Sequence, residues 1–121
     1  MPDSPDPGVP AVPEVRTRLR DAAAMLRQSA AVQPDVRAAL VDLLDELDRA
    51  LQAPAAPPAE VARLADGAAH LAVALHKPHD RGLLGASRDR LEGLVAQAGT
   101  RAPAAVTLAR TLIDALAGMG I

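Results

Sequence analysis

Two of the three histidines lie close together in the sequence and are the side chains best suited to bind a metal ion. His76 and His79 flank Pro78, and Asp80 follows directly, so one short segment contains three potential ligands. Zinc sites in proteins use three or four such ligands in a tetrahedral arrangement. His70 is expected on a different helix face from His76, because their spacing corresponds to about 600° of rotation. The sequence favours a solvated turn with two histidines, and a metal site at His76, His79 and Asp80 is the alternative.

The motifs that could support nucleophilic catalysis or phosphate binding are incomplete. Ser87 lies in the sequence Gly-Ala-Ser-Arg-Asp, which lacks the second glycine of a nucleophile elbow and follows no predicted strand. Gly82 and Gly85 do not have the spacing of a phosphate-binding loop, and Asp80 would repel an anion there. The chain contains no cysteine, which excludes a thiol nucleophile, a disulfide and a cysteine-ligated zinc. We therefore expect a protein without catalytic residues or cofactors, and not an enzyme.

The first two helical segments carry opposite charges on their polar sides. The residues are Arg16, Arg20 and Arg27 in the first segment and Asp42, Asp45, Glu46 and Asp48 in the second. The formal net charge of −2 argues against recruitment of nucleic acid by overall charge, and without aromatic residues no platform exists for base stacking. We expect the opposite charges to face each other, and weak nucleic-acid contact through the first helix is the alternative.

Half of the 121 residues are hydrophobic, mostly Ala, Leu and Val, yet Phe, Tyr and Trp are missing. A chain of this length can form one domain that buries about two-thirds of its unfolded surface. No apolar stretch approaches the roughly 20 residues of a membrane-spanning helix. The acidic, Pro-rich N-terminus also differs from a secretory signal. These features predict a cytoplasmic protein with no membrane partner.

Hydrophobic periodicity predicts an all-α fold, an antiparallel helical bundle of four to five helices. Residues 1–13 are predicted to form a disordered Pro-rich arm, and residues 14–121 a single helical-bundle domain. The first helix is predicted over 14–31 and the second over 34–53, and each starts at a proline followed by an acidic residue. Because only a few residues separate them, we expect an antiparallel hairpin.

Residues 54–100 are harder to divide into helices. A third helix is predicted from about Pro58, and Gly67 within it either permits close approach of another helix or is a tolerated weak point. A Gly-rich fourth helix, capped by Asp80, is expected to fray or merge with its neighbour. Whether the segment forms one or two helices is left open.

The last helix has recognisable signals at both ends. Gly99 is expected to follow the fourth helix in a left-handed conformation, and Thr100 to cap the last one ahead of Pro103. At the other end Gly118 is predicted to adopt the left-handed conformation that stops the helix, with Met119 folded back on the last turn.

Leucines at helical spacing are predicted to form the centre of the core. They are Leu26, Leu40, Leu47, Leu71, Leu91, Leu108, Leu112 and Leu116. Alanines widen the apolar faces at positions 62, 65, 69 and 72 and again at 22, 23 and 24. We interpret these faces as surfaces that the helices bury against one another, and coverage by a partner protein is the alternative.

Two segments resemble a known family. Residues 112–121 (LIDALAGMGI) resemble the "IDAL-x-x-MGI" ending of a small bacterial family, domain of unknown function 4404, and the Leu-rich segment from Pro34 is similar to its central helix. The chain departs from the family over 54–100, where the family is shorter, and at Ala102-Pro103, where it usually has His-Pro. The resemblance implies a small helical protein of unassigned function with no catalytic residues to assign.

These observations together favour a non-enzymatic module that binds a protein partner or associates with itself. The broad apolar faces and the lack of convergent polar groups carry this prediction. The alternatives are a regulatory protein that touches nucleic acid through Arg16 and Arg20, and a metal-binding protein at His76, His79 and Asp80.

Overall fold

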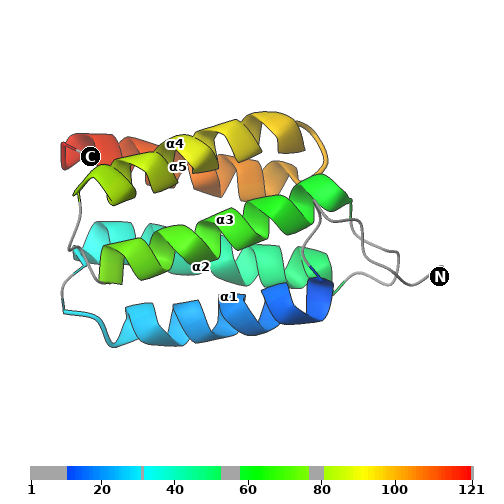
Figure 1. Ribbon diagram of the computed structural model, residues 1–121, viewed down its shortest axis with the longest axis horizontal. Coiled ribbons are helices and arrows are strands. Elements are labelled where there is room, and N and C mark those ends of the chain that lie inside the picture. The colour runs from blue at the N-terminus through cyan, green and yellow to red at the C-terminus, as the bar shows by residue number, and fades with distance from the viewer. Residues whose placement is uncertain (1–10, 31, 53–57, 77–80, 121) are drawn as a thin grey trace.

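A computed structural model describes residues 11–30, 32–52, 58–76 and 81–120. It contains five helices, which are α1 (Val12–Arg27), α2 (Pro34–Leu51), α3 (Ala59–His76), α4 (Arg81–Ala98) and α5 (Pro103–Gly118) (Figure 1). No strand occurs in these four ranges. The all-α prediction is confirmed, and residues 54–100 contain two separate helices. None of the helices is long and apolar enough to cross a membrane, as far as the described residues extend.

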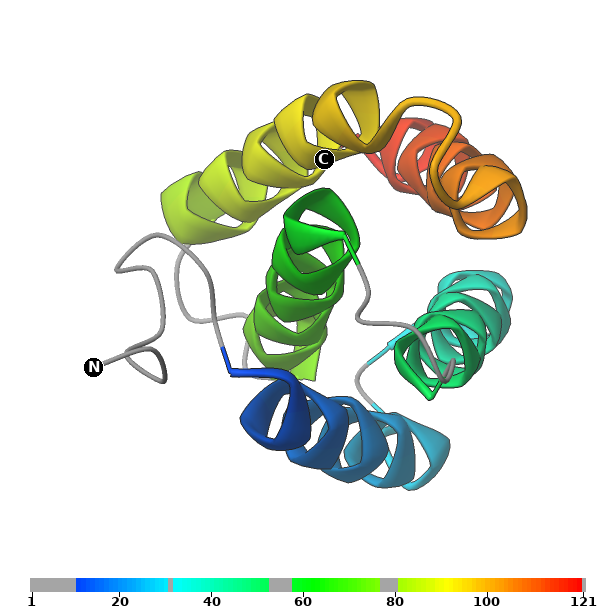
Figure 2. The ribbon, with the colours of Figure 1, turned by 90° about the vertical axis from the view of Figure 1, so that its right-hand side faces the viewer.

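The helices form a bundle with their axes roughly aligned. Helices α1, α3 and α4 form one face, and α2 and α5 lie behind them (Figure 1). Seen from the end, α3 lies between α1 and α4 and also packs against α2 (Figure 2). Helix α1 contacts α2 and α3 but not α4 or α5, within the described ranges. Helix α3 is therefore the element that connects α1 to α4.

The core consists of leucine, valine and alanine side chains from all five helices. Seven of the eight leucines predicted to be central are fully buried, at positions 26, 40, 47, 71, 91, 112 and 116. Leu108 is the exception, because it is only partly buried while Ala109 faces the core. The alanines of α3 at positions 62, 65, 69 and 72 are all buried within the chain. Ala22 and Ala23 are buried too, whereas Ala24 is exposed, so most of the alanine faces are used by the bundle itself.

Helix α1 begins and ends earlier than its predicted bounds of 14–31. It starts at Val12 because Ala11 is the N-cap and Pro13 occupies the first turn, where a missing N–H is not needed. Val12 and Pro13, which the sequence assigns to the arm, are the first residues of α1. Residues 1–10 of the predicted arm lie outside the described residues. At the other end, Gln28 donates to the Met25 carbonyl at 3.2 Å and the helix stops at Arg27.

Side chains of α2 and α3 form hydrogen bonds with the turn after α1, and these bonds explain why the helix stops there. Arg37 of α2 donates to the Ser29 carbonyl oxygen at 2.8 Å. His76 at the end of α3 lies with Nδ1 3.0 Å from the Ser29 hydroxyl oxygen, and Ser29 is 3% exposed. These bonds fix the polar groups of the turn, so a continued helix over 28–31 would lose them.

Two predicted caps of α5 are wrong. Ala102, and not Thr100, is the N-cap, because a residue before proline is driven to extended backbone and Ala102 has φ −143° and ψ 72°. Gly118 is the last helical residue, and Gly120 adopts the positive φ of 80°. The prediction for Gly99 is confirmed, since its φ is 55° directly after α4.

Gly67 marks a close contact between α3 and α4. A Cβ atom at this position would collide with the Leu94 side chain, so the glycine makes room for a leucine of α4. The prediction left open whether Gly67 permits close approach or is a weak point, and the structure supports close approach.

Candidate functional site

A buried carboxylate lies at the middle of α3. The side chain of Asp66 is 12% exposed, in a helix whose neighbouring turns are mostly Ala and Leu. Arg18 of α1 donates from Nη1 to Asp66 Oδ1 at 2.8 Å. Arg90 of α4 approaches Oδ2 with its Nη2 at 3.6 Å. Asp66 therefore links α1 and α4, which do not contact each other in the described ranges.

His70 lies one turn further along α3 and faces the same side. Its Nδ1 is 2.8 Å from the backbone carbonyl oxygen of Asp66 and 3.5 Å from Oδ2 of the same residue. A carbonyl oxygen can only accept, so the hydrogen lies on Nδ1 and the neutral ring presents Nε2 as an acceptor. The side chain is 55% exposed, at the surface of the bundle.

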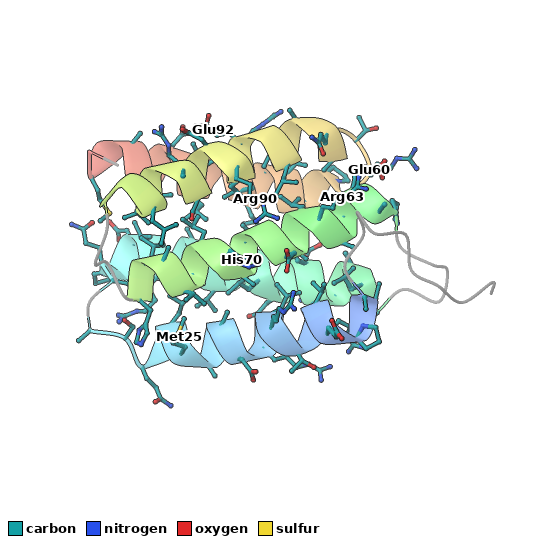
Figure 3. All side chains as sticks on the ribbon, viewed as in Figure 1. Met25, Glu60, Arg63, His70, Arg90 and Glu92 are labelled. Atoms are coloured by element: carbon teal, nitrogen blue, oxygen red, sulfur yellow. The ribbon has the colours of Figure 1, made fainter. Side chains whose placement is uncertain are left out.

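An open groove runs between α1 and α3 beside His70. It has a volume of about 200 Å³, and its apolar lining consists of Ala22, Met25, Ala69 and Val73. Arg18, Asp21 and His70 supply the polar part of the lining. Figure 3 shows Met25 on α1 and His70 on α3 on the same face of the molecule, with Arg90 on the neighbouring α4. We call this surface the α1–α3 groove.

Val73 distinguishes the α1–α3 groove from the rest of the surface. It is 51% exposed, although it belongs to α3, the helix with the most buried residues. The other large exposed hydrophobic residues in the described ranges are Leu83, at 57%, and Met119, at 37%, neither of which lines this groove. An exposed valine beside Met25 and two alanines provides the apolar contact that a bound chain would cover.

Two other hollows are more polar. One, of about 360 Å³, lies where the start of α2 meets the end of α5 and includes Gln33 and Asp35 in its lining. The other, of about 340 Å³, lies between α4 and α5 and includes three charged residues, Glu92, Arg110 and Asp114. Both resemble ordinary solvated junctions between helices more than a surface suited to an apolar contact.

The predicted charge pairing across the hairpin is confirmed for all three of the arginines predicted to take part, which pair with Asp45 and Asp48 of α2. Arg16 Nε lies 3.1 Å from Asp48 Oδ1, and Arg20 Nε lies 3.7 Å from Asp48 Oδ2. Arg27 pairs with Asp45 at 3.3 Å. The two residues proposed to touch nucleic acid, Arg16 and Arg20, thus share one carboxylate of α2.

The candidate metal ligands do not come together in the part of the chain that can be inspected. His79 and Asp80 lie outside the described residues, and the Nδ1 atom of His76 is engaged by Ser29. Among the described residues, no group of three His, Asp or Glu side chains could hold a metal ion. Ser87 lies half-buried on α4, with no strand before it in the described ranges.

Sequence reasoning missed Asp66 and Arg90. A signal existed for Asp66, because it is the only acidic residue of α3 after the first turn and lies one turn from each of Ala62, Ala69 and His70. Nothing in the sequence indicated that Arg90 of α4 would reach the same carboxylate, since this contact depends on how α4 packs beside α3.

Comparisons with protein-family models, with curated proteins and with solved structures give no match for this chain. The resemblance to domain of unknown function 4404 therefore stays a prediction from the two segments that carry it.

Proposed function

We propose that this chain is a non-enzymatic protein-interaction module that binds a segment of a partner protein in the α1–α3 groove. The partner is a different protein or a second copy of the chain, and the experiment below separates the two. We further propose that the chain acts in the cytoplasm and is a helical protein of the domain of unknown function 4404 type.

The observation that carries the proposal is the half-exposed Val73 in an apolar groove next to a fixed charged cluster. Interfaces between proteins combine an apolar centre with a polar rim, and arginine is enriched in them. Ala22, Met25, Ala69 and Val73 supply the apolar centre, and Arg18, Asp21 and His70 supply the rim. The bound segment would cover the valine and place polar groups on the Arg18 and His70 side.

The alanine faces predicted from the sequence do not supply this surface. The α3 alanines are buried by α1, α2 and α4. The apolar surface open to a partner lies instead in the α1–α3 groove.

The alternative of nucleic-acid contact is less favoured because of the ion pairs of α1. Arg16 and Arg20 lie against Asp48, and Arg18 lies against Asp66. A helix that binds phosphates offers cations without nearby carboxylates, since each carboxylate competes with the phosphate.

Site-specific photocrosslinking tests the proposal. A benzophenone amino acid is placed at Val73 in the full chain, and the matched control carries it at Ala104, an exposed residue of α5. Both proteins are irradiated alone and in an extract of the source cells, and crosslinked products are identified by mass spectrometry. Sedimentation equilibrium of the unmodified chain over a range of concentrations measures self-association.

We expect a discrete crosslinked protein from position 73 and none from position 104. A product with twice the chain mass, together with a concentration-dependent mass in sedimentation, identifies a second copy as the partner. A strictly monomeric chain whose position 73 gives no crosslink to any protein would contradict the proposed function.

A further inference from the structure

The charges along the α1–α3 groove indicate what kind of segment would fill it. We propose that the groove takes a segment of another protein that presents an aliphatic side chain to Val73 and a lysine or arginine to Asp21 of α1. This inference rests on the proposed function, because it specifies the partner of the same groove. The experiment below separates the failure of the inference from the failure of the proposed function.

The size of the groove favours side chains of a peptide over a small molecule. Its volume is about 200 Å³, whereas pockets that enclose small ligands measure about 300–1,000 Å³. Its lining extends along two turns of α1, from Arg18 to Met25, which is about 10 Å at a rise of about 1.5 Å per residue. An open groove of this length suits a few side chains that project from a peptide lying across it.

Two of the three polar residues that line the groove are already engaged by the same aspartate. Arg18 donates to Asp66 Oδ1 at 2.8 Å, so its guanidinium group is directed towards α3. His70 has its Nδ1 atom 2.8 Å from the backbone carbonyl oxygen of Asp66. Neither side chain therefore needs a partner protein to satisfy it.

Asp21, the third polar residue of the lining, is different. It is exposed, and no hydrogen bond or ion pair of its side chain occurs within the described residues. Arg18 lies about one turn before it but is bonded to Asp66, and Met25 lies one turn after it in the apolar part of the lining. Asp21 is thus an unpaired carboxylate on the α1 rim, one turn from the apolar centre.

Position, and not overall charge, selects the partner. The formal charges of Arg18 and Arg90 balance those of Asp21 and Asp66 when His70 is uncharged. A cation of the partner is attracted beside Asp21 and repelled beside the two guanidinium groups. Lysine and arginine lay their aliphatic stems along apolar surface and keep the charged end in a polar setting. One basic side chain can therefore cover part of the apolar lining and reach Asp21.

A second copy of the chain suits the groove less well. Placed face to face, it would bring another Asp21, and its Arg18 and Arg90 are engaged by Asp66. An isologous interface pairs a surface with itself, so the groove residues would offer the two Asp21 carboxylates no free cation. The charge arrangement therefore favours a different protein that supplies its own basic residue.

Selection from a phage-displayed library of random peptides tests the inference. The full chain is the bait, and peptides that also bind the Val73→Asp chain are removed, so the retained peptides depend on the groove. Fluorescence anisotropy then measures the affinity of each synthesised peptide for the unsubstituted chain, for Asp21→Asn and for the matched control Asp42→Asn. Asp42 is exposed on α2, does not line the groove and has no ion pair within the described residues.

We expect the retained peptides to share an aliphatic residue with a lysine or arginine near it. Asp21→Asn should weaken their binding about three- to fivefold, as expected for the loss of one exposed ion pair, whereas Asp42→Asn should leave it unchanged. Replacing the basic residue of the peptide with glutamine should have the same effect, and both changes together should weaken binding no further, because each removes the same pair. High salt should reduce the difference between the unsubstituted chain and Asp21→Asn.

The outcomes separate this inference from the proposed function. Retained peptides that lack a basic residue, or that bind Asp21→Asn as tightly as the unsubstituted chain, would overturn the inference and leave the proposed function intact. Failure to retain any peptide that depends on Val73 would contradict the proposed function and the inference with it. Self-association of the chain that Val73→Asp abolishes would identify a second copy as the occupant and overturn the choice of another protein.

Discussion

The side of α1 that faces α2 and the side that faces α3 are packed differently. The edge that faces α2 is lined by three ion pairs, from Arg16 and Arg20 to Asp48 and from Arg27 to Asp45. On the edge that faces α3, Arg18 pairs with Asp66, and beside this pair lies the α1–α3 groove of about 200 Å³. One helix therefore has a filled edge and an open edge.

The difference follows from chain connectivity. Helices α1 and α2 are joined by a short turn, so their facing residues can be matched along an antiparallel hairpin. Helices α1 and α3 are not consecutive and run in the same direction (Figure 2), so no short turn matches their facing residues. Under the proposed function, the α2 edge of α1 serves stability and the α3 edge serves binding.

The largest effect is expected from a buried leucine beneath the filled edge. Leu47 of α2 is fully buried, and Leu47→Ala should lower the free energy of unfolding by about 2–5 kcal/mol, because it removes packed atoms and leaves a cavity. Denaturation with urea measures this change. A loss below about 1 kcal/mol would show that the core under this edge relaxes and that α2 is not central to stability.

Removal of the Asp66 carboxylate, which pairs with Arg18 at the open edge of α1, should have an intermediate effect on stability. Asp66→Ala removes the common partner of Arg18 and Arg90, and we expect a loss of about 1–2 kcal/mol, limited because both arginines are half-exposed and regain water. Asp21→Ala is the matched control on the rim of the groove and should change stability by less than about 0.5 kcal/mol. Equal losses in the two variants would mean that Asp66 does not connect the three helices.

The ion pairs of the filled edge should contribute less. Asp48→Ala leaves Arg16 and Arg20 without their shared carboxylate, and the expected loss is about 0.5–1 kcal/mol in low salt, because both arginines are partly exposed. The difference from the unsubstituted chain should shrink in about 1 M salt, where exposed charges are screened. A loss that is independent of salt would instead indicate lost packing or hydrogen bonding.

The smallest effect on stability is expected in the α1–α3 groove. Val73 is half-exposed, so Val73→Ala should change the free energy of unfolding by less than about 0.5 kcal/mol. Urea denaturation beside Leu47→Ala gives a direct comparison of two apolar truncations. A loss as large as that of Leu47→Ala would show that Val73 belongs to the core and that the edge is not open.

Sequence reasoning captured the parts of the fold that depend on local patterns. Helix α2 was predicted over 34–53 and found at Pro34–Leu51, because a proline start and a regular leucine stripe define it. The central leucines were identified for the same reason, apart from Leu108, where the buried face of α5 is turned slightly towards Ala109. Helix ends were less predictable, since the end of α1 depends on Arg37 and His76 from other helices.

The candidate site could not be predicted from such patterns. The α1–α3 groove lies between helices that are distant in the sequence, and its openness depends on the packing of α1, α2 and α3. Arg90 reaches Asp66 because α4 packs beside α3, an arrangement that the sequence of either helix does not reveal. Periodicity identifies which residues of one helix share a face, but it does not determine which helix that face meets.

The most direct test of the central claim is the affinity of the chain for the protein captured at position 73. Fluorescence anisotropy would compare Val73→Asp with Ala104→Asp, which places the same charge on an exposed position of α5. If the α1–α3 groove is the binding surface, Val73→Asp weakens binding about tenfold or more, as at a central interface residue, and Ala104→Asp leaves it unchanged. Equal affinities of the two variants would contradict the assignment of binding to the open edge of α1.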